Sequence, residues 1–133
     1  MRFTVDRLDH IVIHCTDVEI TATWYQRVLG MDREEFGESQ RTALNFGGQK
    51  INLRPTAAPI GDWFTSKKIE AGSADICLVT AVRPQDVLEH LEGCKITVEQ
   101  GPVPKTGALG PMTSVYCRDP DGNLIEISSY MAD

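Results

Sequence analysis

Polar side chains stand at matching places in two copies of one sequence pattern. The stretch LDHIVIHC, a helical segment and ALNFGGQKINLR are echoed by SADICLVT, a second helical segment and SVYCRDPDGNLIEIS. Aligning the apolar positions pairs His10 with Asp75 and Asn52 with Glu126. An imidazole and two carboxylates supply nitrogen and oxygen donors that suit a hard or borderline divalent ion, such as Mn²⁺, Mg²⁺, Zn²⁺, Ni²⁺ or Fe²⁺. Core packing alone does not explain this arrangement.

The two carboxylates lie within apolar stretches and therefore need partners. Asp75 stands in ADICLV and Glu126 in NLIEIS. An isolated buried carboxylate costs several kcal/mol or shifts its pKa. A metal ion could be the partner, and the non-metal alternative is a buried ion pair with an arginine: Arg41, Arg54 or Arg118.

The first half of the chain predicts a βαβββ module. Residues 8–15 alternate as a strand that places His10 and His14 on one face. The helix that follows stops at Gly30, and Gly47-Gly48 is typical of a two-residue hairpin turn. The predicted elements are a strand at 8–15, a helix at 17–29 and strands at about 31–37, 41–47 and 49–54.

The second half repeats this order after a linker at 55–72, which is longer than the usual ~4–6 residues. The segment GPVPKTGALGP, residues 101–111, is rich in glycine and proline. It therefore predicts an irregular loop, which could cover a substrate. The predicted elements are a strand at 74–80, a helix at 84–92 and strands near 95–100, 113–118 and 124–129.

Length and composition predict one soluble domain. The 133 residues suffice for a single core, so we expect one domain, 1–133, with modules at 7–55 and 72–130. A net charge of −6 and scattered basic residues argue against a nucleic-acid partner. No apolar run approaches the ~20 residues that span a bilayer, and the N-terminus does not resemble a secretory signal. The expected location is the cytoplasm, without membrane association.

The cysteines do not suggest a metal cluster or a nucleophile. No CxxC pair occurs, and thiols of a chain that is not secreted usually stay reduced. Cys15, Cys77 and Cys117 fall inside predicted strands, which favours a role as small core residues.

The segments LDHIVIHC, TWYQRVLGM and YCRDPDGNLIEISSY resemble the vicinal oxygen chelate superfamily, which includes glyoxalase I and the bleomycin-resistance proteins, extradiol dioxygenases and fosfomycin-resistance proteins. The resemblance covers residues 7–130 and is greatest to small one-domain glyoxalase-like proteins. It implies an α+β fold in which two βαβββ modules pair into an open cupped barrel around a divalent metal ion. It also implies a homodimer.

The resemblance implies that the metal ligands lie on the first and last strand of each module. The implied metal ligands in this chain are His10, Asp75 and Glu126. Glu126 is also the expected catalytic residue. Asp75 stands where a histidine is more usual, and Asn52 where glyoxalase I carries a glutamate. One histidine with two carboxylates differs from the two histidines and one carboxylate that iron oxygenases favour. Three protein ligands leave coordination positions open for substrate.

The resemblance implies a metal-dependent lyase or isomerase of the glyoxalase type. Its substrate would be a small molecule with vicinal oxygens, reacting through a metal-stabilised oxyanion. The alternatives are a metal-free binding protein of the bleomycin-resistance type and an antibiotic-modifying thiol transferase of the fosfomycin-resistance type. The predicted substrate-binding residues are Asn52, Arg54, Tyr116 and Arg118.

Overall fold

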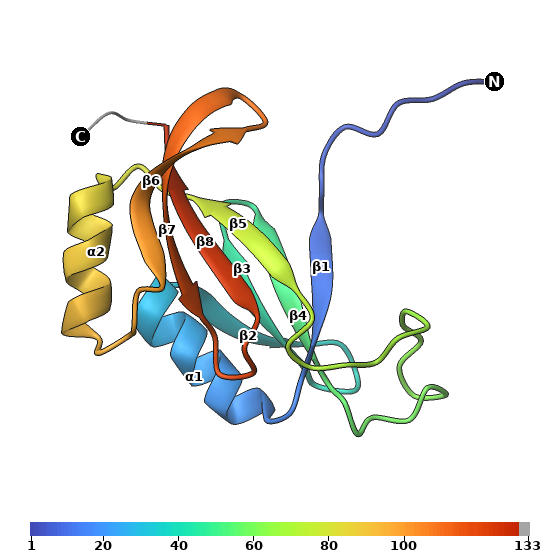
Figure 1. The fold of residues 1–133 in the computed structure, drawn as a ribbon. Helices are drawn as coiled ribbons and strands as arrows, with labels where there is room; N and C mark the ends of the chain where they lie inside the picture. Colours follow the sequence, from blue (N-terminus) through green and yellow to red (C-terminus); the bar gives the residue numbers. More distant parts are fainter. Residues whose placement is uncertain (131–133) are drawn as a thin grey trace. The chain divides into compact units, whose positions relative to one another are not determined.

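Each half of the computed structural model, which describes residues 1–130, is one βαβββ unit. Unit 1 is Met1–Glu70 and unit 2 starts at Ala71 (Figure 1). The predicted α+β fold class is confirmed. Unit 1 contains β1 (His10–Cys15), α1 (Val18–Leu29), β2 (Asp32–Phe36), β3 (Arg41–Phe46) and β4 (Gln49–Pro55). Unit 2 contains β5 (Asp75–Val79), α2 (Pro84–Gly93), β6 (Gln100–Gly107), β7 (Gly110–Arg118) and β8 (Leu124–Ser129).

The first and last strands of each unit are parallel neighbours. The strand order is β1-β4-β3-β2 in unit 1 and β5-β8-β7-β6 in unit 2. In unit 1, His10 at the start of β1 is paired with Lys50, two residues before Asn52. In unit 2, Asp75 at the start of β5 is paired with Leu124, two residues before Glu126. The register therefore reproduces the correspondence that the apolar pattern predicted.

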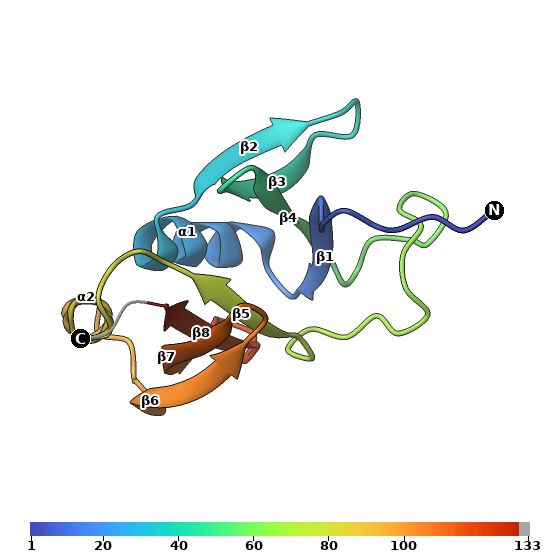
Figure 2. The ribbon, with the colours of Figure 1, turned by 90° about the horizontal axis from the view of Figure 1, so that it is seen from above.

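One helix covers one face of each sheet, as Figure 2 shows for α1 along the β2–β4 strands and for α2 beside β6, β7 and β8. The helix α1 begins where Asp17 accepts a 3.0 Å hydrogen bond from the amide of Ile20, and it ends at Gly30 in the left-handed conformation. Neither helix of residues 1–130 is long and apolar enough to cross a membrane. Buried apolar residues include Ile13, Trp24, Tyr25, Leu44, Ile51 and Leu53 in unit 1, and Val87, Leu91, Val115, Ile125 and Ile127 in unit 2.

The prediction for residues 95–111 was wrong. No strand lies at 95–99, and the supposed loop forms β6 and the start of β7. Pro102 and Pro104 are compatible with β6 because it is an edge strand, where an amide on the outer side needs no partner. The register shifts between Gln100 and Val103, so the proline-containing stretch is a β-bulge that continues into a hairpin.

Gly101 allows β6 to lie close against β7 at this bulge. Its φ of 105° belongs to the region that side chains rarely adopt. A Cβ atom there would overlap the carbonyl oxygen of Ser114 and lie 2.8 Å from the Cα of Val115. The position therefore needs glycine both for its backbone conformation and for its close approach to β7.

We predict that Gly101→Ala lowers the free energy of unfolding by about 4 kcal/mol or more, because a backbone clash adds to the conformational strain. Gly110→Ala is the matched control, since Gly110 has a similar φ of 123° but no atom within 4 Å of the place that a Cβ would take. It should cost only about 1–3 kcal/mol. Urea unfolding monitored by tryptophan fluorescence measures both, and equal losses would contradict the role of close approach.

Candidate functional site

His10 is oriented by its neighbour Asp9. Its Nδ1 lies 2.8 Å from the Asp9 Oδ2, and a carboxylate only accepts, so Nδ1 carries the hydrogen and donates it. The same hydrogen bond holds the pKa of Asp9 below its ordinary value. In the neutral imidazole the lone pair of His10 is then on Nε2. A carboxylate bonded to the far nitrogen is the usual support of a metal-binding histidine.

Asn52 carries a buried acceptor that nothing in residues 1–130 satisfies. The residue is 6% exposed, and its Oδ1 has no hydrogen-bond partner. It lies on β4 between Val12 of β1 and Ala43 of β3, whose side chains cannot donate. An unsatisfied buried polar atom costs about 1–3 kcal/mol. Asn52 is thus suited to receive a hydrogen-bond donor or a cation.

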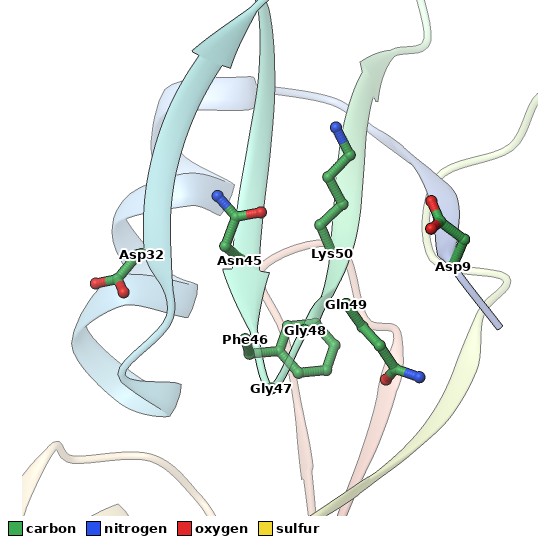
Figure 3. Close-up of a pocket in the computed structure, with 8 residues that line it drawn as sticks. All are labelled: Asp9, Asp32, Asn45, Phe46, Gly47, Gly48, Gln49 and Lys50. Atoms are coloured by element: carbon green, nitrogen blue, oxygen red, sulfur yellow. The ribbon is translucent and has the colours of Figure 1, made fainter. Parts of the chain in front are cut away.

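A cavity of about 480 Å³ opens at the end of the unit 1 sheet where β1 begins (Figure 3). Asp9 borders it, and Figure 3 shows the Lys50 side chain between those of Asn45 and Asp9. The Lys50 ammonium lies 3.7 Å from the Phe36 ring centre and 3.8 Å from a Glu34 carboxylate oxygen. Its charge is therefore already compensated. The lining residues are Asp9, Asp32, Asn45, Phe46, Gly47, Gly48, Gln49 and Lys50.

Arg54 binds the backbone of the linker. It is fully buried and donates to the carbonyl oxygens of Pro55 at 3.1 Å, Ala58 at 2.9 Å and Trp63 at 3.1 Å. The Trp63 ring is also in contact with the Arg41 guanidinium, 4.1 Å from the ring centre. Sequence reasoning missed this role because carbonyl partners leave no mark in the side-chain pattern. A substrate contact by Arg54 stays a prediction.

Glu126 lies on the face of the unit 2 sheet that α2 does not cover. Its Oε2 accepts a 2.7 Å hydrogen bond from the Ser114 hydroxyl, and the Ser128 hydroxyl lies 3.3 Å away. The two serine oxygens are 2.6 Å apart, and both serines are completely buried. Sequence reasoning missed Ser114, although strand parity places it with Tyr116, just as it places Ser128 with Glu126.

Tyr116 and Cys77 flank Glu126 on the neighbouring strands β7 and β5. Burial, together with a hydrogen bond to Glu126, raises the pKa of Tyr116 to about 12. Burial also raises the pKa of the Cys77 thiol, whose sulfur lies 3.2 Å from the Ser128 hydroxyl. The expectation that Cys77 is a core residue was wrong, because strand alternation places it with Asp75 on the exposed face. Both groups stay protonated at neutral pH and can donate hydrogen bonds.

A second cavity, of about 430 Å³, lies wholly in unit 2 beside Glu126. The Lys105 ammonium is 5.6 Å from the Tyr116 ring centre, and the Tyr130 hydroxyl accepts a 3.1 Å hydrogen bond from the amide of Leu109. Tyr130 thus holds the tip of the β6–β7 hairpin at the cavity. The lining residues are Cys77, Val79, Lys105, Thr106, Gly107, Ala108, Met112, Tyr116, Glu126 and Tyr130.

The arginine alternative for the two carboxylates is not supported. Arg118 pairs with Glu99 at 3.1 Å, and Arg41 and Arg54 bind linker carbonyls. In residues 1–130 none of these arginines forms a salt bridge with Asp75 or Glu126. Asp75 is exposed on the same sheet face as Glu126.

The predicted metal ligands are divided between the two units. Unit 1 contains His10, and unit 2 contains Asp75 and Glu126. Among residues 1–130, no three His, Cys, Asp or Glu side chains form a group that could hold a metal ion. The assignment of these three residues to one ion stays a prediction.

Known proteins match nearly the whole chain. Residues 7–127 match the family model of the Glyoxalase/Bleomycin resistance protein/Dioxygenase superfamily. Glyoxalase domain-containing protein RDO1 of Mycosarcoma maydis is 46% identical over 97% of this chain and 71% of its own length. Virulence protein STM3117 of Salmonella typhimurium is 40% identical over 98% of this chain and 89% of its own. The structure of an integron cassette protein from the mobile metagenome of V. cholerae is 41% identical, with a TM-score of 0.94 over 98% of this chain and all of that chain.

We predict that Arg54→Met lowers the free energy of unfolding by about 2–4 kcal/mol, because buried linker carbonyls lose their donor. Arg41→Met is the control from the same linker contact, and it should cost about 1 kcal/mol or less because Arg41 is partly exposed. Urea unfolding measures both variants. An Arg54→Met protein as stable as the wild type would exclude the anchoring role.

His14 should make the stability depend on pH. Burial, with the charge of Arg54, lowers its pKa, and its Nε2 lies 3.1 Å from the Thr65 hydroxyl. Protonation therefore favours the unfolded chain, so stability is complete above the unfolded pKa of about 6.5 and decreases as the pH falls below it. We predict that His14→Gln reduces the change in the urea midpoint concentration between pH 7.5 and 5.0. A variant whose midpoint changes with pH as much as that of the wild type would contradict this.

Proposed function

Because this chain belongs to the Glyoxalase/Bleomycin resistance protein/Dioxygenase superfamily, we propose that it is a metal-dependent glyoxalase-like enzyme. Members of the superfamily typically bind a metal ion and small molecules, and they often form dimers. The proposed substrate is a small molecule with vicinal oxygen atoms, and the proposed reaction is a lyase or isomerase step. The working form would be a cytoplasmic homodimer.

The proposed metal ligands are His10, Asp75 and Glu126. The observation that carries this proposal is the 2.8 Å bond between Asp9 and the Nδ1 of His10, which directs the lone pair to Nε2. The unsatisfied Oδ1 of Asn52 gives independent support, because a cation or an ordered ligand would satisfy it.

The chemistry of the donor set fits a divalent ion. One imidazole nitrogen and two carboxylates suit Mn²⁺, Ni²⁺, Zn²⁺, Fe²⁺ or Mg²⁺. When bound, such an ion supplies a Lewis acid that polarises a substrate oxygen.

Proton transfer would belong to Glu126. Asn52 has an amide where a second carboxylate could stand, and an amide is not a base at neutral pH. Glu126 lines the unit 2 cavity, so a substrate in that cavity would be within its reach. Tyr116, which remains protonated up to its pKa of about 12, would donate a hydrogen bond to the substrate or to Glu126. Arg118 and Arg54 complete the proposed set of substrate-binding residues.

A metal-free binding protein is the second candidate. The unit 2 cavity favours it, since Val79, Met112 and the rings of Tyr116 and Tyr130 provide surface for an organic ligand. Such a protein would keep its ligand affinity after the metal ligands are replaced.

We predict about one divalent ion per chain in protein incubated with Mn²⁺, Ni²⁺ or Zn²⁺ and then desalted. His10→Ala and Glu126→Ala should lower the occupancy at least tenfold, whereas His90→Ala should not, because His90 is an exposed residue of α2. Elemental analysis of untagged protein measures all four samples. Metal-free wild-type protein after incubation with each ion would favour the binding candidate.

Asp9→Asn tests the hydrogen bond between Asp9 and His10 directly. The amide keeps the size of the carboxylate but removes its charge, so the fixed donor role of Nδ1 is weakened. We expect metal affinity to fall about 10- to 100-fold, as is common when such a supporting group is lost. Asp6→Asn, in the same exposed N-terminal segment, is the control and should bind as the wild type does. Equal affinities of Asp9→Asn and the wild type would remove this support.

A further inference from the structure

Three side chains form a hydrogen-bonded row that ends at the Glu126 carboxylate. Cys77 lies 3.2 Å from Ser128, Ser128 lies 2.6 Å from Ser114, and Ser114 lies 2.7 Å from the Oε2 of Glu126. The row crosses three adjacent strands, β5, β8 and β7. Nothing in the proposed function so far uses the serines or the thiol.

Counting hydrogens gives the row a direction. A hydroxyl has one hydrogen to donate, and a carboxylate has none. The short bond to Glu126 uses the hydrogen of Ser114, so the 2.6 Å contact between the serine oxygens needs the hydrogen of Ser128, which therefore points to Ser114 in preference to the Glu126 Oε2 at 3.3 Å. The Cys77 thiol, protonated at neutral pH, then donates to Ser128. Every bond in the row points toward Glu126, and aligned bonds strengthen one another.

Both serines are held rigidly. Ser114 and Ser128 face each other directly across β7 and β8, and neither is exposed to solvent. Because residue 101 is a glycine, β6 can lie close against the backbone of Ser114. The hydroxyls therefore hold fixed positions relative to the carboxylate.

We infer that Ser114 and Ser128 are positioning residues for Glu126, an inference that rests on the proposed function. Ser114 donates to Oε2, and the Ser128 oxygen lies 3.3 Å from the same atom, so neither serine occupies the other oxygen, Oε1, which would face a metal ion or a substrate. The carboxylate is thereby fixed as a ligand through one oxygen. Without the serines Oε2 would lose its short hydrogen bond, and the orientation of the carboxylate toward the ligand would be less restricted.

The test compares Ser114→Ala and Ser128→Ala with Ser129→Ala. Ser129 is a matched control, because it is a buried serine on the same strand whose side chain points to the opposite face. The first readout is Mn²⁺ affinity by titration calorimetry. We expect each of the first two variants to bind about 10- to 100-fold more weakly and the control to bind as the wild type does.

The second readout needs no metal. In ¹³C-labelled, metal-free protein at pH 7.5, the Glu126 Cδ resonance is identified by its disappearance in Glu126→Gln. Loss of the Ser114 hydroxyl should shift this resonance, and Ser129→Ala should not. Circular dichroism identifies any variant that fails to fold, and the Ser128→Ala protein then provides the comparison.

The two readouts separate the two proposals. If Ser114→Ala and Ser128→Ala leave both the Cδ resonance and the Mn²⁺ affinity unchanged, the positioning role is overturned. If the wild type binds no Mn²⁺ while the resonance still shifts in these variants, the metal proposal fails and the hydrogen-bonded row is supported. A resonance shift with weaker Mn²⁺ binding supports both.

Discussion

Parallel pairing between the first and last strands of each unit is the constraint that brings the candidate site residues of that unit together. Parallel neighbours need a long crossover connection along the chain. Here a helix and two further strands form that connection from β1 to β4, and again from β5 to β8. The pairing then places residues from the two ends of a module next to each other, Val12 beside Asn52 and Cys77 beside Glu126. Polar residues some 40 or 50 positions apart in sequence, His10 and Asn52 in unit 1 and Asp75 and Glu126 in unit 2, thereby lie on neighbouring strands of one sheet.

Strand alternation divides the unit 2 sheet into a packed face and a face that carries Glu126. In unit 2 the buried side of β8 carries Ile125 and Ile127, while Glu126 between them points the other way. A carboxylate in the centre of a sheet is tolerated there because hydroxyl donors solvate it in place of water. Unit 1 differs at the equivalent position, since Asn52 lacks such donors and keeps an unsatisfied oxygen. The two units thus share geometry but not electrostatics.

Local sequence patterns predicted most of the fold but less of the site. The helix limits and the βαβββ order followed from alternation, caps and turn residues, and the structure confirms them. Residues 101–107 were mispredicted because the glycines and prolines suggested a loop, and only the sheet order reveals that β6 is an edge strand. Cys77 was misjudged by residue type, although its alternation with Asp75 already indicated the exposed face. The contacts of Arg54 and Ser114 depend on long-range packing, which no local pattern encodes.

Arg54 recognises the linker by its carbonyl groups, and every residue has one. The guanidinium therefore binds the backbone of residues 55–63 and makes no hydrogen bond to their side chains. It also lies 5.9 Å from the Trp63 ring centre. Replacing the side chains at Pro55 and Ala58 would therefore leave the accepting carbonyl groups in place, whereas replacing Arg54 would remove the donor of all these bonds. This explains why a stretch without hydrophobic periodicity still follows a defined course, and it makes the linker a place where new surface chemistry can arise without loss of the fold.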